Sequence, residues 1–305
     1  MKNMEEIKEE KHNKRFSKEW YNKYYKILFL IPVLFLFISL IYLGYFYSKN
    51  GDFIYKDVSL SGGTSLTING EVSQEILEPE LKLIFPDVSF THLSELTSKK
   101  QIALRIESSA SPEDLKKEVE TILGYSLTED NSSVEFTGSS LSKDFYKQLI
   151  IALIISFILM SIVIFILFKS FVPSIAVIFA AFADIVISLA VIDYLGIKIS
   201  AAGIAAFLML LGYSVDTDIL LTSRALKSQE KPLNSRIFGA FKTGIFMTLT
   251  ALAAVVPAFF LITGLPDSFR QIFLVLSIGL TADIFNTWLT NAGIIKWYCD
   301  KKKIQ

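Results

Sequence analysis

Six apolar stretches, each long enough to cross a lipid bilayer, constrain this chain more than any other feature of its sequence. A hydrocarbon core about 30 Å thick is crossed by roughly 20 apolar residues in a helix. The stretches occupy residues 27–47, 149–168, 173–192, 199–221, 244–262 and 272–295. An apolar fraction of 52% and a mean hydropathy of +0.47 agree with this pattern. We therefore predict a polytopic α-helical membrane protein with six transmembrane helices.

The first stretch, 27–47, carries no charge and has Pro32 near its start. A cleavable signal peptide is the alternative interpretation of an apolar stretch at this position. Against it, the apolar run is longer than the core of a signal peptide, and no small-residue cleavage site follows. We predict that this stretch is retained as the first span.

Lysine and arginine positions predict the orientation of the spans. Eight of these residues lie in the tail 1–26, five lie in 222–243 and four follow the last span, whereas the short loops on the opposite side contain only Lys198 and Arg270. We therefore expect both termini in the cytoplasm of a prokaryote and residues 48–146 outside its plasma membrane. The predicted parts are a basic tail (1–26), the first span (27–47), an external domain (48–146), a five-span bundle (147–298) and a C-terminal tail (299–305).

Residues 48–146 differ in composition from the rest of the chain. They hold nine basic and seventeen acidic residues, a net charge of −8, so the whole-chain balance of 30 Lys+Arg against 30 Asp+Glu hides two opposed zones. Alternating apolar residues predict strands at 64–69, 88–93, 101–107 and 133–137, and helical spacing predicts helices at 73–85 and 111–123. Pro79 is expected to distort or split the first helix. The order β-α-β-β-α-β is that of a ferredoxin-like α+β domain.

The composition also excludes several classes of protein. A single cysteine, Cys299, excludes an intramolecular disulfide framework, and His12 and His92 leave little for zinc. We interpret His92, on a predicted strand, as structural, and we expect no metal and no cofactor. The sequence has no Gly-x-x-x-x-Gly-Lys-[Ser/Thr] loop for ATP, and its zero net charge argues against a nucleic-acid partner. An enzyme is not expected.

Four aspartates fall inside the predicted spans, where a charge costs about 2.5–3.5 kcal/mol on insertion scales. Asp184 lies in the third span, Asp216 and Asp218 lie in the fourth, and Asp283 lies in the sixth. Small residues recur every fourth position around Asp184, which suits close helix packing. A polar stripe with helical spacing begins at the last of these acids, and it comprises Asp283, Asn286, Thr287, Thr290 and Asn291.

These polar faces can converge on one seam inside the bundle, to which Thr250 and Lys242 of the fifth span are assigned. Asp216 and Asp218 are about 200° apart around a regular helix, so either only one of them faces the seam or the helix is irregular there. Two interpretations of the acids stay open. They hydrogen-bond neighbouring helices and fix the packing, or a desolvated carboxyl group binds and releases a proton as access alternates.

Two motifs carry a family resemblance. The first, Gly62-Gly63-Thr64, opens the first predicted strand. The second lies in the fourth span, begins with Gly212, Tyr213 and Ser214, and runs to Asp218. Together with one isolated span, an external domain and five clustered spans, they resemble the SecF family of the Sec protein-export machinery. Bacterial members carry an acid where this chain has Thr217, so the sequence is similar to an archaeal-type variant.

The resemblance implies half of a twelve-span resistance–nodulation–division transporter core, with a SecD-like subunit supplying the other half. It implies an accessory role in protein export, coupled to a proton or other ion gradient. The implied partners are the SecD-like subunit, a SecY-type channel, the exported unfolded polypeptide and membrane lipid. The candidate relay residues are Asp184, Asp216, Asp218, Asp283 and Lys242.

Two other functions stay open. One is a self-contained half-transporter that exports lipids or small molecules as a homodimer. The other is a structural scaffold without a transport role.

Overall fold

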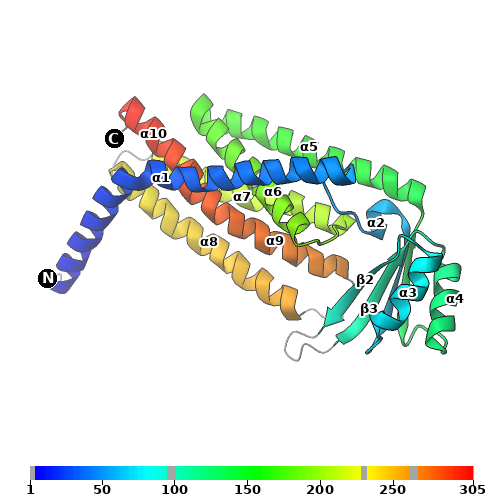
Figure 1. Cartoon of the computed structure of the whole chain (residues 1–305). Coiled ribbons are helices and arrows are strands. Elements are labelled where there is room, and N and C mark those ends of the chain that lie inside the picture. The colour runs from blue at the N-terminus through cyan, green and yellow to red at the C-terminus, as the bar shows by residue number, and fades with distance from the viewer. Residues whose placement is uncertain (1–3, 95–100, 228–231, 262–266, 305) are drawn as a thin grey trace.

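The helices and strands form a long helical bundle with a small sheet at one end. The structure is a computed structural model, and it describes residues 4–94, 101–227, 232–261 and 267–304. Both termini lie at the end of the bundle opposite the sheet (Figure 1). The elements are α1 (Met4–Asn50), α2 (Val58–Ser61), β1 (Gly63–Asn69), α3 (Gln74–Ile84), β2 (Ser89–Ser94), β3 (Gln101–Ser108), α4 (Pro112–Leu123), β4 (Ser132–Thr137), α5 (Ser139–Phe168), α6 (Phe171–Tyr194), α7 (Ala201–Lys227), α8 (Leu233–Leu261), α9 (Asp267–Phe285), the π-helical η1 (Asn286–Asn291) and α10 (Ala292–Lys302).

Within the described residues, six helical segments are long and apolar enough to cross a membrane. They are Lys23–Asn50, Ser139–Phe168, Phe171–Tyr194, Ala201–Leu226, Leu233–Leu261 and Phe269–Lys302. Each corresponds to one predicted stretch, which confirms the number of spans. The helices continue beyond the apolar stretches, since α1 begins at Met4 and α5 begins at Ser139. The flanking residues include many glutamates and lysines, which favour helix without favouring lipid.

The bundle has a central and a peripheral set of helices. Within the apolar 18-residue stretch of each helix, 56% is buried in α6 and in α7, against 6% in α5 and 11% in α8. The helices α6 and α7 pack against each other and against α9, and η1 packs against α6. Polar side chains in this interior are therefore shielded from lipid, whereas α5 and α8 present broad faces to lipid or to another protein.

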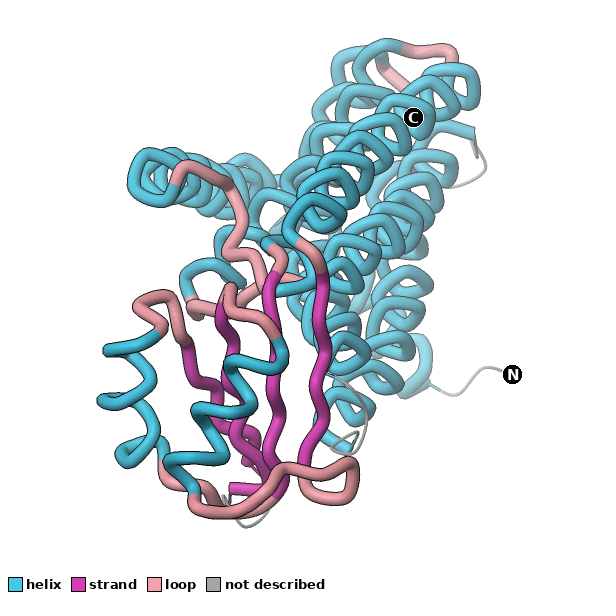
Figure 2. Tube along the Cα trace, turned by 90° about the vertical axis from the view of Figure 1, so that its right-hand side faces the viewer, coloured by secondary structure: helices cyan, strands magenta, loops and turns pink. Residues whose placement is uncertain are grey.

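The small unit contains a four-stranded antiparallel sheet. Its strand order is β2-β3-β1-β4. Helices α3 and α4 cover one face of the sheet (Figure 2), where Leu66 and Ile106 of the sheet meet Leu77 of α3 and Leu115 of α4, all fully buried. Because strand side chains alternate between faces, the opposite face carries polar neighbours such as Arg105.

The structure corrects one expectation about this unit. Helix α3 is continuous from Gln74 to Ile84 with Pro79 inside it, so the proline does not split the helix. Proline removes one N–H donor from the helix, while Leu77 and Leu81, both fully buried, anchor the helix on the sheet. The ends of α4 follow the sequence, because Ser111 accepts a hydrogen bond from the Asp114 amide and Gly124 ends the helix at φ 74°.

The Gly62-Gly63 pair has a structural role at the start of β1. Gly62 has φ 84° and Gly63 has φ 129°, a region that residues with a Cβ rarely adopt. A Cβ on Gly62 would lie 2.3 Å from the Cα of Ser139, and one on Gly63 would lie 2.4 Å from the carbonyl oxygen of Ser108. The pair therefore allows β1 to pass close to the start of α5 and to the end of β3.

We predict that Gly63→Ala destabilises the protein more than Gly70→Ala does. Both glycines have positive φ, but nothing lies within 4 Å of a Cβ on Gly70. The expected loss is about 1 kcal/mol for Gly70→Ala and about 2–4 kcal/mol for Gly63→Ala, which adds the clash with Ser108. Thermal unfolding of the purified full chain in detergent measures the difference. Equal losses would contradict a close contact at Gly63.

Candidate functional site in the membrane bundle

Three of the four predicted intramembrane aspartates meet in the interior of the bundle. Asp184 of α6, Asp218 of α7 and Asp283 of α9 are all 0% exposed. Among the described residues, no ion pair joins any of the three to a lysine, arginine or histidine. An isolated buried carboxylate is strongly unfavourable. Within the described part of the chain, the cluster therefore has no basic side chain to balance its charge.

Asp184 has a hydrogen-bond donor on each carboxyl oxygen. The Ser214 hydroxyl of α7 donates to Oδ2 at 2.5 Å, and the Asn286 amide of η1 donates to Oδ1 at 2.6 Å. Ala180 and Ser188, one turn away on either side, are also fully buried and allow neighbouring helices to approach closely. Asp184 therefore ties α6 to both α7 and η1.

Thr287 of η1 connects the other two acids. Its Oγ1 lies 2.9 Å from Oδ1 of Asp218 and 2.9 Å from Oδ1 of Asp283. A threonine hydroxyl has one hydrogen to donate. Both contacts are hydrogen bonds only if one carboxyl group is protonated and donates to the threonine oxygen. Thr287 therefore lies between Asp218 and Asp283 and can donate its hydroxyl hydrogen to only one of them at a time.

Two further threonines complete the surroundings of Asp283. Thr217 of α7 donates to the Ser214 carbonyl at 2.8 Å and lies 3.1 Å from Oδ1 of Asp283, and Thr248 of α8 lies 3.5 Å from Oδ2. Neither threonine is among the residues assigned to the seam from sequence. For Thr217 the available signal in the sequence was its position between two acids, Asp216 and Asp218.

The polar stripe of the last span lies on a π-helix that a regular 3.6-residue period does not predict. Asn286, Thr287, Thr290 and Asn291 are at most 1% exposed, and all belong to η1. Asn286 reaches Asp184 on α6, whereas Asn291 donates to Oδ1 of Asp218 on α7 at 2.7 Å. The wider turn of a π-helix, a feature frequent at functional sites, lets one short segment serve both neighbours.

Several predicted site residues lie outside this cluster. Asp216, Lys242, Thr250, Gly212 and Tyr213 are exposed on the surface of the bundle. The position of Asp216 follows from its angular offset from Asp218, which faces inward. Thr250 donates to the carbonyl of its own helix at Phe246, at 2.7 Å, and so satisfies its hydroxyl without the seam.

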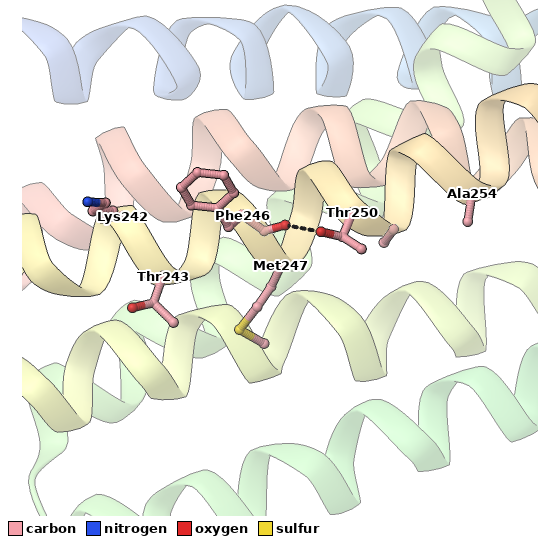
Figure 3. Close-up of a pocket in the computed structure, with 7 residues that line it drawn as sticks. Lys242, Thr243, Phe246, Met247, Thr250 and Ala254 are labelled. Atoms are coloured by element: carbon pink, nitrogen blue, oxygen red, sulfur yellow. Dashed lines mark hydrogen bonds between the residues drawn. The ribbon is translucent and has the colours of Figure 1, made fainter.

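The exposed side of α8 borders a groove of about 830 Å³. Figure 3 shows side chains of α8 that border the groove, with Met247 extending away from the helix. The lining residues are Lys242, Thr243, Phe246, Met247, Thr250, Ala251 and Ala254. A charged residue and small side chains on a peripheral span are typical of a protein contact rather than of lipid.

The Gly62-Gly63-Thr64 motif lies in the small unit and not in the acid cluster. Thr64 is fully buried and donates its hydroxyl to the Ala110 carbonyl at 2.6 Å. The structure thus gives the motif a role in positioning β1.

A set of hydrogen bonds connects the small unit to the bundle. Lys198, between α6 and α7, lies 2.6 Å from Glu107 of β3 and 2.5 Å from Ser89 of β2. Gln271 of α9 accepts from the Ser200 hydroxyl at 2.5 Å and donates to the Lys198 carbonyl. A movement of α9 can therefore be transmitted to the sheet through Gln271, Lys198 and Glu107.

Asp57, between α1 and α2, belongs to the same junction. Burial raises the pKa of Asp57 from 3.8 to about 6, and the negative charge of Glu107 adds to the rise, while hydrogen bonds from Ser59 oppose it. The Asp57 amide also donates to the Ile199 carbonyl at 3.1 Å. The junction therefore contains a carboxyl group that titrates in the mildly acidic range.

These features define a class: a polytopic helical membrane protein with a small α+β unit and a cluster of acids inside its spans. The family model described as "Protein export membrane protein SecD/SecF, C-terminal" matches residues 118–301. The chain belongs to this protein-export family.

The relatives are archaeal proteins named "Protein-export membrane protein SecF". That of Methanolacinia petrolearia is 36% identical over 282 residues, covering 90% of this chain and 94% of the relative. That of Methanocaldococcus jannaschii is 35% identical over 279 residues, covering 90% of this chain and 96% of the relative. That of Methanothermobacter thermautotrophicus is 37% identical over 284 residues, covering 91% of this chain and 94% of the relative.

Two solved structures share the fold. One is SecDF of Thermus thermophilus, a translocon-associated membrane protein, with a TM-score of 0.74 at 18% identity over 91% of this chain. The other is SecDF in a super-membrane-facing form, with a TM-score of 0.58 at 21% identity over 90% of this chain. The chain spans 38% of the length of each of these SecDF chains.

We predict that Thr287→Val destabilises the bundle and that Thr287→Ser does not. Valine preserves the shape but removes the hydroxyl between Asp218 and Asp283, and an unsatisfied buried polar group costs about 1–3 kcal/mol. The thermal unfolding midpoint of the purified chain measures this loss. If valine and serine behave alike, the shared hydrogen bond does not stabilise the bundle.

Asp57 predicts a pH dependence of stability. Folding raises the pKa of Asp57 from 3.8 to about 6. The protonated carboxyl group therefore contributes stability below pH 3.8, and this contribution is lost as the pH rises through about 6. Asparagine also caps helices, so Asp57→Asn keeps the cap of α2 while removing the titration. The melting temperature of the wild type minus that of Asp57→Asn should fall from about pH 4 to about pH 7. A constant difference would contradict the assignment.

Proposed function

We propose that this protein is a SecF-like accessory subunit that assists protein export across the cytoplasmic membrane, and that it uses a proton or other ion gradient to do so. The observation that carries the coupling is the cluster of Asp184, Asp218 and Asp283. Three buried acids on three spans, without a paired cation among the described residues, are costly for packing alone. Membership of a protein-export family supports the pathway.

In this proposal, protonation controls how α6, α7 and α9 pack. A proton between Asp218 and Asp283 lowers the charge of that pair from −2 to −1, and its loss places two like charges on either side of Thr287. Repulsion then favours a different arrangement of α7 and α9. Gln271 and Lys198 transmit that movement to Glu107 in the sheet, so the external unit moves as the acids load and unload.

A SecD-like subunit is the proposed partner inside the membrane. The chain spans 38% of each SecDF neighbour, which leaves room for a second half supplied by another subunit. The apolar groove on α8 and the exposed Asp216 favour protein cover, because a charged group facing hydrocarbon is unfavourable. We assign the α8 groove to the SecD-like subunit, and in this proposal Asp216 and Lys242 contribute to the seam through contacts with that subunit.

The proposed orientation places both termini in the cytoplasm and the small unit outside. The termini share one end of the bundle, opposite the sheet (Figure 1), and lysine and arginine concentrate at the terminal end. The sheet and its two covering helices then form a ferredoxin-like external module. It would contact the exported unfolded polypeptide near a SecY-type channel, with no catalytic step in this chain.

We predict that Asp218→Asn lowers gradient-dependent export without removing the protein from its complex. Asparagine is close in size to aspartate but cannot lose a proton, so the coupling is lost while the packing is nearly preserved. The expected loss of export rate is about tenfold, as for typical coupling energies. Export by membrane vesicles with an imposed proton gradient gives the rate, and affinity purification in mild detergent gives the complex.

Asp144→Asn is the matched control, because Asp144 lies exposed at the start of α5. Normal export by Asp218→Asn would refute the coupling. Recovery of a homodimer with solute efflux, and of no SecD-like or channel protein, would favour the self-contained exporter instead.

A further inference from the structure

A polar pocket of about 480 Å³ lies where the start of α8 meets α1 and α10. These helices meet at the end of the bundle that carries both termini (Figure 1). The charged residues of the lining are Lys26 of α1 and Lys296 and Asp300 of α10. Among the described residues that line it, none belongs to the acid cluster or to the α8 groove. A cavity of this size is typical of a pocket for a small ligand or headgroup.

The ammonium group of Lys296 stands at this pocket, although its side chain is only 5% exposed. It donates to Oδ1 of Asn234 at 3.0 Å, lies 3.2 Å from Oδ2 of Asp300, and lies 5.5 Å from the centre of the Tyr25 ring. All three of these neighbours line the pocket. A buried ammonium group needs a counter-charge, but the Asp300 side chain is 51% exposed and such a pair is weak. The positive charge of Lys296 is therefore only partly balanced.

Two further features of the lining favour an anion. Among the described residues that line the pocket, Lys26 adds a second ammonium group, so two cations stand beside one carboxylate. Helix α8 begins at Leu233, and Leu233 and Asn234 also line the pocket. The first N–H groups of a helix have no partner within the helix and attract anions, phosphate above all. Lysine is a common phosphate ligand as well, so the lining suits a phosphate group.

The position of the pocket identifies a membrane lipid as the source of that phosphate. Its residues stand at the terminal ends of three candidate spans, namely Lys23–Asn50, Leu233–Leu261 and Phe269–Lys302, and lipid headgroups lie at the ends of spans. Trp297, next to Lys296 on α10, is 44% exposed, and tryptophan is enriched at this interface. Basic pockets between span ends are typical headgroup sites.

Apolar side chains continue from the pocket toward the middle of the bundle. Leu30 follows Lys26 by four residues on α1, and Phe238 follows Asn234 by four residues on α8. Residues four apart share one face of a helix. Leu30 is 61% exposed and Phe238 is 53% exposed, so both are accessible to a hydrocarbon chain whose headgroup occupies the pocket. A free phosphate ion would make no use of these two side chains.

We propose that this pocket binds the headgroup phosphate of an anionic membrane lipid, with Lys26 and Lys296 as its charged ligands. The hydrocarbon chains of the lipid lie along Leu30 and Phe238. The bound lipid joins α1 to α8 and α10, so it stabilises the packing of the first span on the last two. The proposal does not depend on the proposed export function, because binding requires only this chain and the lipid.

The test measures the melting temperature of the purified full chain in a nonionic detergent as dioleoylphosphatidylglycerol is added. A ligand that binds only the folded state raises this temperature as its concentration rises. Two other arms identify the source of the phosphate. Dioleoylphosphatidylcholine has the same chains and a phosphate but no net charge, and inorganic phosphate has no chains. We expect a saturable rise with phosphatidylglycerol, a weaker apparent affinity for phosphatidylcholine and no rise with inorganic phosphate.

Two variants locate the binding in the pocket. Lys26→Gln and Lys296→Gln should each weaken the apparent affinity for phosphatidylglycerol by about fivefold, the usual contribution of one basic residue beside anionic lipid. Lys23→Gln and Lys301→Gln are the matched controls, because each removes an exposed lysine of the same helix that does not line the pocket. Both controls should keep the wild-type affinity. If Lys296→Gln fails to fold, the exposed Lys26 decides the result.

Wild-type affinity in Lys26→Gln would overturn the site. An equal loss in Lys23→Gln and Lys26→Gln would also overturn it, because the attraction would then be spread over the basic surface. Equal affinity for the two lipids would overturn the role of the negative headgroup. A saturable rise with inorganic phosphate equal to that with phosphatidylglycerol would overturn the lipid as the ligand. The export assay of Asp218→Asn is unaffected by any of these outcomes, so the two proposals fail separately.

Discussion

The neutralisation of three buried carboxyl groups is the constraint on which the rest of the bundle depends. Asp184, Asp218 and Asp283 are fully buried, and each takes hydrogen bonds from helices other than its own. Such bonds have strict geometry, so α6, α7, α9 and η1 cannot slide past one another without leaving a polar atom unsatisfied. Apolar packing alone gives little register to helices in lipid, since lipid tails are as apolar as the side chains. The acids therefore specify the arrangement while making it sensitive to protons and cations.

The same constraint explains which helices of the bundle have exposed surfaces. The central helices use their polar and small faces on one another, which leaves α5 and α8 with mostly apolar, exposed surfaces. The exposed surface of α8 includes Lys242 beside small residues. The central helix α7 also has one exposed acid, Asp216. The junction of Lys198, Glu107 and Gln271 adds a polar contact at the other end of the bundle, so the interior acids and the sheet share helix α9.

Much of the fold could be predicted because its signals are local. Apolar length gave the six spans, and cap chemistry placed both ends of α4 at Ser111 and Gly124. Of the two outcomes expected at Pro79, distortion or a split, the split does not occur, because burial of Leu77 and Leu81 on the sheet outweighs one missing hydrogen bond. In the site, the inward direction of Asp218 follows from helical geometry once one face is known to be buried. The choice between Thr248 and Thr250 does not, because it depends on how α8 is rotated about its axis. The π-turn at η1 depends on tertiary partners for Asn286 and Asn291, which a single sequence does not reveal.

The position of Thr217 shows how a carboxyl group can move between helices without leaving its place in the bundle. By the family resemblance, bacterial members carry their acid on the fourth span where this chain has Thr217. Here the Thr217 hydroxyl lies 3.1 Å from the carboxyl group of Asp283, so a carboxyl group of α9 lies directly beside this position of α7. What the bundle requires is a carboxyl group at that location among hydroxyl donors, since its chemistry depends on desolvation and hydrogen bonding rather than on the helix that bears it.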